Sequence, residues 1–326
     1  MSALPAGLAQ TRRALRQFVL GPANVPQQCV LGIRDPQSEV SVWLEGAGVP
    51  LDVTHNNVMV SANPLTIAIG LENTSPLMGP RKSGLALRFR EMRGERRLLG
   101  EIRLRMAEAT ALEDEQLCLF ETRGCSNYCV PQVRLWIRYL DHAYRKWKSE
   151  RGHAPGSQIR TSELRSVFAF YICPRPVGLV SVVHENAGNI FPMDLIGPVG
   201  TRHFVLALHN TSAPLRLMAQ SRRVALSSVP IEQSSRAFEL GRNHKQPAVD
   251  FGGLPFPTMP SESFGLPVPR FSLRTRELQI ETIRRLETHT LFAGTIVRDQ
   301  RHTDGPQMFQ VHGFYQAWRL REGARS

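Results

Sequence analysis

Lysine is scarce in this chain of 326 residues, and runs of like charge are missing. Only four of the forty basic residues are lysines, namely Lys82, Lys146, Lys148 and Lys245. The net charge of +12 is therefore carried by scattered arginines, with no run of five or more basic residues. Because no motif interleaves basic and aromatic residues, we expect no nucleic-acid partner. Arginine suits the recognition of phosphate and carboxylate groups, although a GC-rich genome produces the same bias.

Long apolar runs are also missing. The longest candidates, such as Leu65–Leu71 and Phe204–Leu208, have the length of strands and not of the roughly 18–20 residues that span a bilayer. Near the N-terminus, Leu8, Leu15 and Phe18 can share one face of a short helix, but the continuous apolar core of a signal peptide is lacking. We expect a cytoplasmic protein with no membrane partner.

Cysteine is too sparse for a disulfide framework. The five cysteines are an odd number spread over the whole chain: Cys29, Cys118, Cys125, Cys129 and Cys173. A zinc site is disfavoured because the CxxxC spacing of the middle group lacks a second pair of ligands. We expect reduced thiols and no metal.

The chain divides near its middle. Residues 133–147 place apolar side chains three and four apart, which predicts an amphipathic helix: Val133, Trp136, Ile137, Leu140, Tyr144 and Trp147. Residues 149–161 are rich in Gly, Pro and Ser, as linkers are. The pattern predicts two domains, residues 1–150 and 151–326. Their net charges, +4 (19 basic, 15 acidic) and +8 (21 basic, 13 acidic), make the second the better candidate for an anionic ligand.

The two halves share an internal repeat. Residues 67–87 and 204–226 both contain an apolar stretch, an Asn-Thr-Ser triplet, Pro-Leu, a serine and an Ala-Leu pair. The triplets are Asn73-Thr74-Ser75 and Asn210-Thr211-Ser212. The same order of features in both halves predicts a tandem duplication.

Short β-rich segments dominate the second half. They are separated by Gly, Pro, Asn and Asp, and they are Pro176–Val183, His203–Leu208, Arg223–Val229, Leu278–Leu286, Leu291–Val297 and Met308–Phe314. A short helix is predicted over Pro214–Ser221. No GxGxxG motif opens a helix after a strand, which disfavours a dinucleotide-binding α/β domain. We expect a mainly β fold with short helices, most simply a closed barrel.

The order of motifs over residues 173–315 resembles the flavin reductase-like family, whose fold is the FMN-binding split barrel. Cys173–Val180 is similar to the opening "RPVALVTT" strand, and Asn186–Met193 is similar to the "G-x-N-x-A-P" turn. Ser221–Leu226 falls on the "sgefvvN" strand. Glu281–Val297 resembles the "E-C-x-V … G-x-H-T-L-F-x-G-x-V" strand pair, the most specific motif in the chain.

The resemblance also has departures. Ile196–Gly200 replaces the usual serine-containing step, and Asp194 stands where a small residue or serine is frequent. The first half keeps a closer version of that step in Val60–Leu65, preceded by Thr54–Asn57, but has no counterpart of the His289 motif. Structural roles are favoured for four polar residues of the first half: Thr54, Asn56, Ser61 and Thr74.

What the resemblance implies is two tandem split β-barrels of the FMN-binding type, with FMN near their interface. The chain would then be an internal pseudo-dimer with one site retained, or part of a homodimer. His289 is the catalytic candidate, orienting a hydride donor or stabilising reduced flavin as an imidazolium. The cofactor-binding candidates are Asn189, Phe191, Pro192, Asn210, Thr211, Ser212, Ser221, Arg242, Asn243, His244 and Lys245. The alternative for each is a turn or core residue with a local role.

Three functions fit the resemblance. The first is an FMN-dependent oxidoreductase that takes hydride from NADH or NADPH, with a partner monooxygenase as one destination of the reduced flavin. The second is a flavoenzyme that uses bound FMN on a specialised organic substrate. The third is a non-catalytic flavin-binding module.

Overall fold

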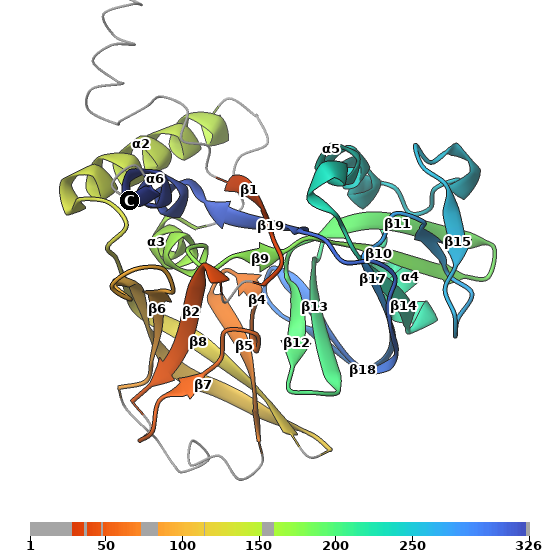
Figure 1. Cartoon of the computed structure of the whole chain (residues 1–326), viewed down its shortest axis with the longest axis horizontal. Coiled ribbons are helices and arrows are strands. Elements are labelled where there is room, and N and C mark those ends of the chain that lie inside the picture. Colours follow the sequence, from red (N-terminus) through yellow and green to blue (C-terminus); the bar gives the residue numbers. More distant parts are fainter. Residues whose placement is uncertain are drawn as a thin grey trace, which may run out of the picture.

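The computed structural model describes residues 28–35, 38–46, 48–72, 84–113, 115–151 and 160–323. The fold is mainly β with short helices, which confirms the expected fold class. Two seven-stranded antiparallel sheets, one from each half, lie side by side (Figure 1). The predicted short helix around Leu8–Phe18 and the first Asn-Thr-Ser triplet lie outside the described residues.

The sheet of the first half has the strand order β3-β2-β6-β7-β8-β5-β4. Its strands are β2 (Val40–Glu45), β3 (Leu51–Asp52), β4 (Asn57–Ala62), β5 (Leu65–Glu72), β6 (Ala86–Glu91), β7 (Leu98–Leu112) and β8 (Glu115–Asn127).

The sheet of the second half has the strand order β11-β10-β14-β17-β18-β13-β12. Its strands are β10 (Gly178–His184), β11 (Ala187–Met193), β12 (Ile196–Val199), β13 (His203–His209), β14 (Arg223–Ser228), β17 (Arg274–Arg285) and β18 (His289–Arg301). When the strands of each sheet are counted along the chain, both sheets have the same order, 2-1-5-6-7-4-3.

The pairing registers of the two sheets agree as well. Glu72 at the end of β5 pairs with Glu115 at the start of β8, and His209 at the end of β13 pairs with His289 at the start of β18. The repeat noticed in the sequence falls on β5 and β6 in one half and on β13 and β14 in the other. Topology therefore makes Glu115 the counterpart of His289.

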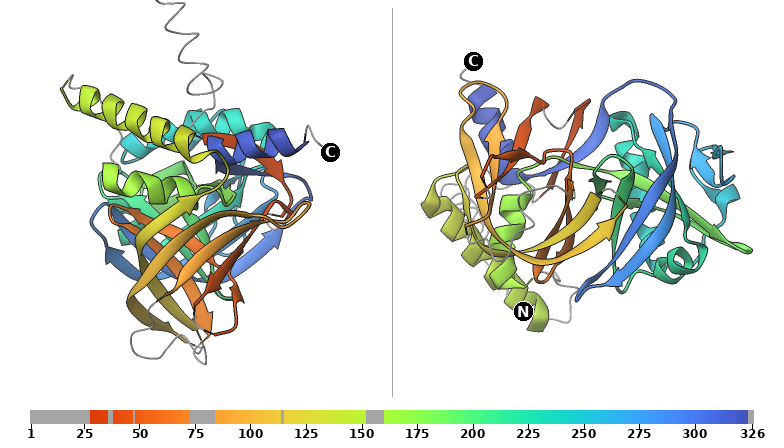
Figure 2. Two further views of the ribbon diagram at one scale, coloured as in Figure 1. Left: turned by 90° about the vertical axis from the view of Figure 1, so that its left-hand side faces the viewer. Right: turned by 90° about the horizontal axis from the view of Figure 1, so that it is seen from below.

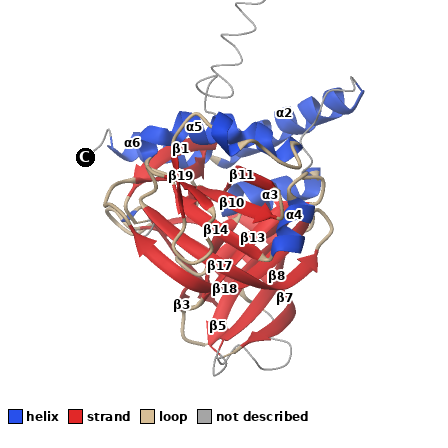
Figure 3. Cartoon of the chain, turned by 90° about the vertical axis from the view of Figure 1, so that its right-hand side faces the viewer, coloured by secondary structure: helices blue, strands red, loops and turns tan. Residues whose placement is uncertain are grey.

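The remaining strands and helices flank the two sheets. The three-stranded sheet β1-β19-β9 lies above them, and Figure 3 shows most helices along the same side. These elements are β1 (Gln28–Ile33), β9 (Arg175–Pro176), β19 (Gln307–His312), β15 (Thr258–Pro260), β16 (Pro267–Pro269), α2 (Gln132–Arg151), α3 (Thr161–Phe170), α4 (Leu215–Ser221), α5 (Ser234–Glu239), α6 (Gly313–Gly323) and the 3₁₀ turns η3 (Ile231–Gln233), η4 (Leu240–Lys245) and η5 (Phe251–Gly253). No helix in the described part of the chain has the length and apolar character to cross a membrane.

Helix α2 confirms the helix predicted over residues 133–147, but its apolar stripe faces outward. The buried residues of this helix are Leu135 and Tyr139. The Tyr139 ring stacks on Phe168 of α3 with 5.9 Å between centroids. The side chains of the stripe that are 48–70% exposed are Val133, Trp136, Leu140, Tyr144 and Trp147.

The C-terminal segment packs back onto the first half (Figure 2). Strand β19 pairs with β1 along its whole length, and α6 packs beside it. The fully buried carboxylate of Glu39 accepts hydrogen bonds from the Tyr315 hydroxyl and the Arg319 guanidinium of α6. The second half thus contributes a strand and a helix that pack on the first half.

The two sheets contact each other through equivalent strands. Strand β4 packs against β12, β13 and β18, and β12 packs in turn against β4 and β5. One apolar cluster lies within the second half, whereas the cluster of the first half continues across the contact to Val199, Val205 and Leu291. Residues near the ends of β4 and β12 are therefore placed to form sites that neither half completes alone.

Candidate functional site

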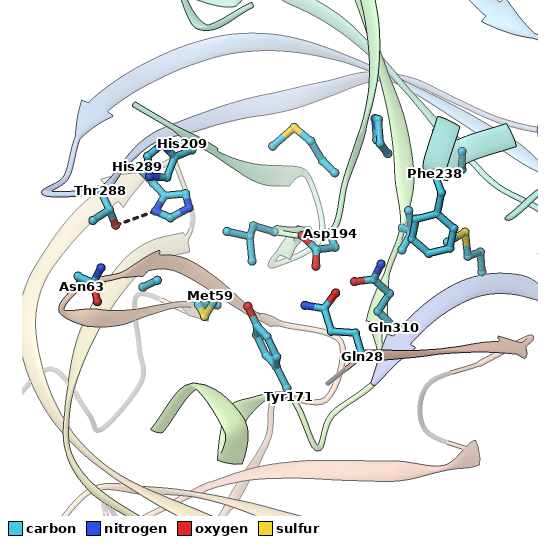
Figure 4. A pocket seen from close by; sticks show the side chains of 17 residues that line it. Gln28, Met59, Asn63, Tyr171, Asp194, His209, Phe238, Thr288, His289 and Gln310 are labelled. Carbon is cyan, nitrogen blue, oxygen red and sulfur yellow. Dashed lines mark hydrogen bonds between the residues drawn. The ribbon is translucent and has the colours of Figure 1, made fainter. Parts of the chain in front are cut away.

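A cavity of about 400 Å³ lies between the two halves at the β17–β18 turn, and we call it the histidine cavity (Figure 4). The first half contributes the end of β4 and its turn, and the second half contributes the β11–β12 connection. Its polar lining residues are Gln28, Asn63, Asp194, His209, Thr288, His289, Gln310 and Tyr171, and apolar side chains such as Met59 and Phe238 complete it. The volume falls within the range of about 300–1,000 Å³ that small-molecule pockets occupy.

His289 is held at one end of this cavity by a chain of hydroxyl groups. Its Nδ1 lies 2.8 Å from Thr288 Oγ1, which lies 3.0 Å from Ser61 Oγ of the first half. The ring of His209 contacts the His289 ring edge to face, with 5.1 Å between centroids. The side chain is only 8% exposed, so its orientation is set by packing before any ligand arrives.

Burial makes His289 a neutral imidazole at pH 7. Desolvation, aided by the neighbouring His209, lowers its pKa to about 4 against a smaller opposing effect of Asp194. Of the two roles predicted for His289 from the sequence, the one that needs an imidazolium does not match this resting form. A neutral ring bonded to Thr288 through Nδ1 leaves Nε2 as the nitrogen for a ligand.

The depressed pKa of His289 predicts a loss of stability in acid. The unfolded chain binds the proton near pH 6.5 and the folded chain only near pH 4, so stability is full above pH 6.5 and falls as the pH is lowered toward 4. We expect this histidine to account for up to about 3 kcal/mol of that loss. Urea unfolding at pH 7 and pH 4.5 should show a smaller pH effect in His289→Gln than in the unchanged protein. Equal losses in both proteins would contradict the assignment.

The opposite end of the cavity carries amide, hydroxyl and carboxylate groups. Tyr171, whose pKa burial raises to about 12, points its hydroxyl into the space, and the amides of Gln28 and Gln310 lie beside it (Figure 4). Gln310 is 7% exposed, and its Oε1 has no hydrogen-bond partner. Asp194, the acidic departure noted in the sequence, is neutralised by an ion pair with Arg175.

A smaller cavity of about 270 Å³, the side cavity, adjoins the first beyond His209 and His289. It is here that three of the predicted cofactor-binding residues meet: Pro192, Ser212 and His244. The His244 ring bonds the Pro192 carbonyl oxygen through Nε2 at 2.8 Å, and burial lowers its pKa. The fold therefore brings these three residues together beside His289.

Five other predicted residues hold the fold together away from both cavities. Asn189 donates to the Gln246 carbonyl oxygen, and Asn243 donates to that of Ile190. Asn210 donates to the carbonyl oxygens of Leu286 and Glu287. Phe191 lies in the apolar core, and Ser221 donates to the Val183 carbonyl oxygen. These contacts are the local structural roles that the sequence analysis gave as the alternative to cofactor binding, because turn amides and hydroxyls satisfy nearby backbone groups.

The predicted phosphate clamp over residues 242–245 is not assembled. Arg242 is exposed and pairs with Glu239, and Lys245 is exposed. Neither residue lines the histidine cavity or the side cavity. Thr211 is exposed too, with its hydroxyl 2.8 Å from His209 Nδ1. The loop folds as a 3₁₀ turn in which Asn243 and His244 face β11, so its cations point elsewhere.

Several lining residues were not predicted. Asn63 and Met59 come from the first half, Tyr171 follows α3, and Gln28 and Gln310 come from β1 and β19. One signal pointed to the first of these, because the Val60–Leu65 step was the better match to the family. The first half supplies that step to a cavity whose histidine belongs to the second half.

The topological counterpart of the histidine cavity is closed by direct hydrogen bonds. Glu115, in the place of His289, accepts from the backbone N–H and hydroxyl of Thr201 and lies 3.2 Å from His203 Nδ1. Asn56 Oδ1 accepts from Gly200 N at 2.9 Å and from Gly70 N at 3.2 Å. Side chains thus fill the position that corresponds to the histidine cavity.

No protein-family model and no curated protein matches the chain. Solved structures resemble part of it. An NADH:FAD oxidoreductase from Streptomyces globisporus is 16% identical, with 49% of this chain and 95% of that chain covered, at a TM-score of 0.41. An FMN-binding protein from Thermus thermophilus is 22% identical (40% and 73% covered, TM-score 0.35), and flavoredoxin from Methanosarcina acetivorans is 15% identical (40% and 69%, 0.36). In these three structures the similarity spans about half of this chain or less.

Proposed function

We propose that the chain is an FMN-dependent oxidoreductase that binds one flavin in the histidine cavity. The observation that carries the proposal is the cavity itself, open beside the buried neutral His289 while its counterpart beside Glu115 is closed. A single site at the junction of two similar sheets follows from a pseudo-dimer in which only one of two interface sites has been kept.

The residues present suit the ring of a flavin. An isoalloxazine ring carries an imide N–H between two carbonyl groups, and the unpartnered Oε1 of Gln310 can accept from such a donor. Its amide nitrogen, the Gln28 amide and the Tyr171 hydroxyl can serve the carbonyl oxygens. Ser212 in the side cavity is the donor we assign to the phosphate end. A bound FMN would supply two-electron redox chemistry.

We also propose that the two halves, residues 1–150 and 151–326, arose by duplication of one split-barrel domain. The equal strand order and the matching Glu72–Glu115 and His209–His289 pairs support this origin. In this proposal, the difference between His289 in one copy and Glu115 in the other arose as the two copies diverged.

The hydride source we favour is NADH or NADPH, with a small molecule or a partner monooxygenase receiving the electrons. His289 is positioned for this role because its Nε2 is the ring nitrogen not engaged by Thr288. A neutral imidazole can hydrogen-bond a reactant without repelling a cationic nicotinamide product. A flavoenzyme acting on an organic substrate remains the second candidate, favoured by a further cavity next to this one.

One flavin per chain is the expected result of titrating flavin-free protein with FMN. The measurement is quenching of flavin fluorescence at a known protein concentration, followed by anaerobic addition of NADH or NADPH. Bleaching of bound flavin would identify the reductase, and tight FMN without bleaching would favour the organic-substrate enzyme. Two equivalent flavins per chain would contradict the single-site proposal, and no binding would refute the flavin assignment.

A further inference from the structure

A second cavity lies on the other side of Asp194, and its volume is about 460 Å³. The beginnings of β4 and β12 both line it, so it sits where equivalent strands of the two sheets meet. We call it the arginine cavity after its five arginines, Arg34, Arg175, Arg274, Arg276 and Arg301.

A three-residue partition separates it from the histidine cavity. Tyr171 lines only the histidine cavity, Arg175 lines only the arginine cavity, and Asp194 lines both. The Arg175 guanidinium lies over the Tyr171 ring, 3.5 Å from its centroid, and pairs with Asp194 through Nη1. The two spaces therefore touch without sharing their polar groups, apart from the Asp194 carboxylate.

Arg175 is buried without its full set of partners. The residue is 4% exposed, and neither Nε nor Nη2 has a hydrogen-bond partner. An arginine cannot lose its charge to escape burial, so two unmet donors on a buried guanidinium cost free energy. These two nitrogens lie on one edge of the guanidinium fork, which is the arrangement that binds both oxygens of a carboxylate or phosphate.

The rest of the lining sets the shape of the ligand. Arg274 and Arg276 are both paired with Asp299, and Arg301 is paired with Asp304, so the rim is largely neutralised. Further polar groups of the lining are Asp35, Thr54, His55, Asn57, Ser228 and Gln307, and its apolar walls include Met59, Phe170, Ile196, Phe204, Leu226 and Phe309. Such walls favour an apolar body, while the unmet donors of Arg175 favour one anionic head.

We infer that the arginine cavity binds a small organic oxyanion, a carboxylate or phosphate monoester with an apolar body, held by Arg175 beside the histidine cavity. The inference does not require a bound flavin, because it rests on the residues of the arginine cavity. Its failure can therefore be told apart from a failure of the flavin proposal.

The test is fluorine NMR of flavin-free protein with 4-fluorobenzoate, 4-fluorophenyl phosphate and the neutral 4-fluorobenzyl alcohol. We expect at least one anion to bind with a dissociation constant below about 1 mM, and the alcohol to bind at least about tenfold more weakly. The carboxylate and phosphate probes show which head group is preferred. Equal binding of alcohol and anions, or no binding of either anion, would overturn the inference.

The variant is Arg175→Met/Asp194→Asn, which removes both charges of the buried pair together. We expect it to weaken anion binding by at least about tenfold. The matched control is Arg298→Gln, an exposed arginine on β18 that pairs with Glu262 and lines none of the cavities described, and it should bind the anions as before. The comparison of probes in unchanged protein decides the question even if the double variant does not fold.

Saturating FMN is the final arm of the experiment. We expect the anion to bind FMN-loaded protein with the same affinity within about twofold, because the partition keeps the two spaces apart. Competitive displacement of the anion by FMN would overturn the inference, since Arg175 would then belong to the flavin site.

Discussion

Replacing His289 by alanine should slow reduction of bound FMN by NADH or NADPH about 100-fold, the usual contribution of one positioned acid-base or hydrogen-bonding group. The reason is geometric, because the ring is held at the cavity by Thr288 and by the contact with His209. FMN affinity should fall less than about fivefold, since the amides and Tyr171 at the other end remain. Anaerobic stopped-flow absorbance and fluorescence titration measure the two quantities separately.

The matched control removes a histidine away from the cavities described. His302 bonds Thr275 at 3.0 Å and lines none of those cavities, so His302→Ala should leave both the reduction rate and FMN affinity within about twofold of their original values. If His289→Ala reduces as fast as His302→Ala, the role assigned to His289 is wrong. A loss of FMN binding equal to the loss of rate would instead make His289 a binding residue.

Local patterns were enough to predict the repeated elements of the fold. The second-half segments around residues 203, 223 and 291 became β13, β14 and β18, because β-branched and aromatic residues between turn formers favour strands. The pairing of β1 with β19 could not be predicted from the sequence. The paired residues lie some 280 positions apart, and no local signal encodes such a contact. The outward stripe of α2 was equally hidden, because periodicity marks an apolar face without naming what covers it.

The site was predictable only where one half of the chain supplied it. His289, Pro192 and His244 lie together within the second half, on β18, β11 and η4. Asn63 and Gln310 depend on how the two halves meet. The cationic loop at 242–245 misled the prediction because charge composition does not reveal direction: its arginine and lysine face outward.

The close contacts at the closed site beside Glu115 predict that Gly70 is sensitive to substitution. Gly70 on β5 donates to Asn56 Oδ1 and accepts from Asn56 Nδ2 at 2.6 Å. A Cβ atom at this position would lie 2.6 Å from the Gly200 backbone nitrogen of the opposite half. Because backbone there cannot move without separating β5 from β12, we expect Gly70→Ala to lower the free energy of unfolding by about 3 kcal/mol.

Urea unfolding measures this effect, and Gly241→Ala is its control because a Cβ atom there meets nothing within 4 Å. That control should stay within about 0.5 kcal/mol of the unchanged protein. The added methyl group lies at the closed site and not at His289, so refolded Gly70→Ala should still bind one FMN. A Gly70→Ala protein as stable as the control would mean that the contact between Asn56, Gly70 and Gly200 does not hold the halves together. Two flavins bound by the variant would mean instead that these contacts alone had kept the second site shut.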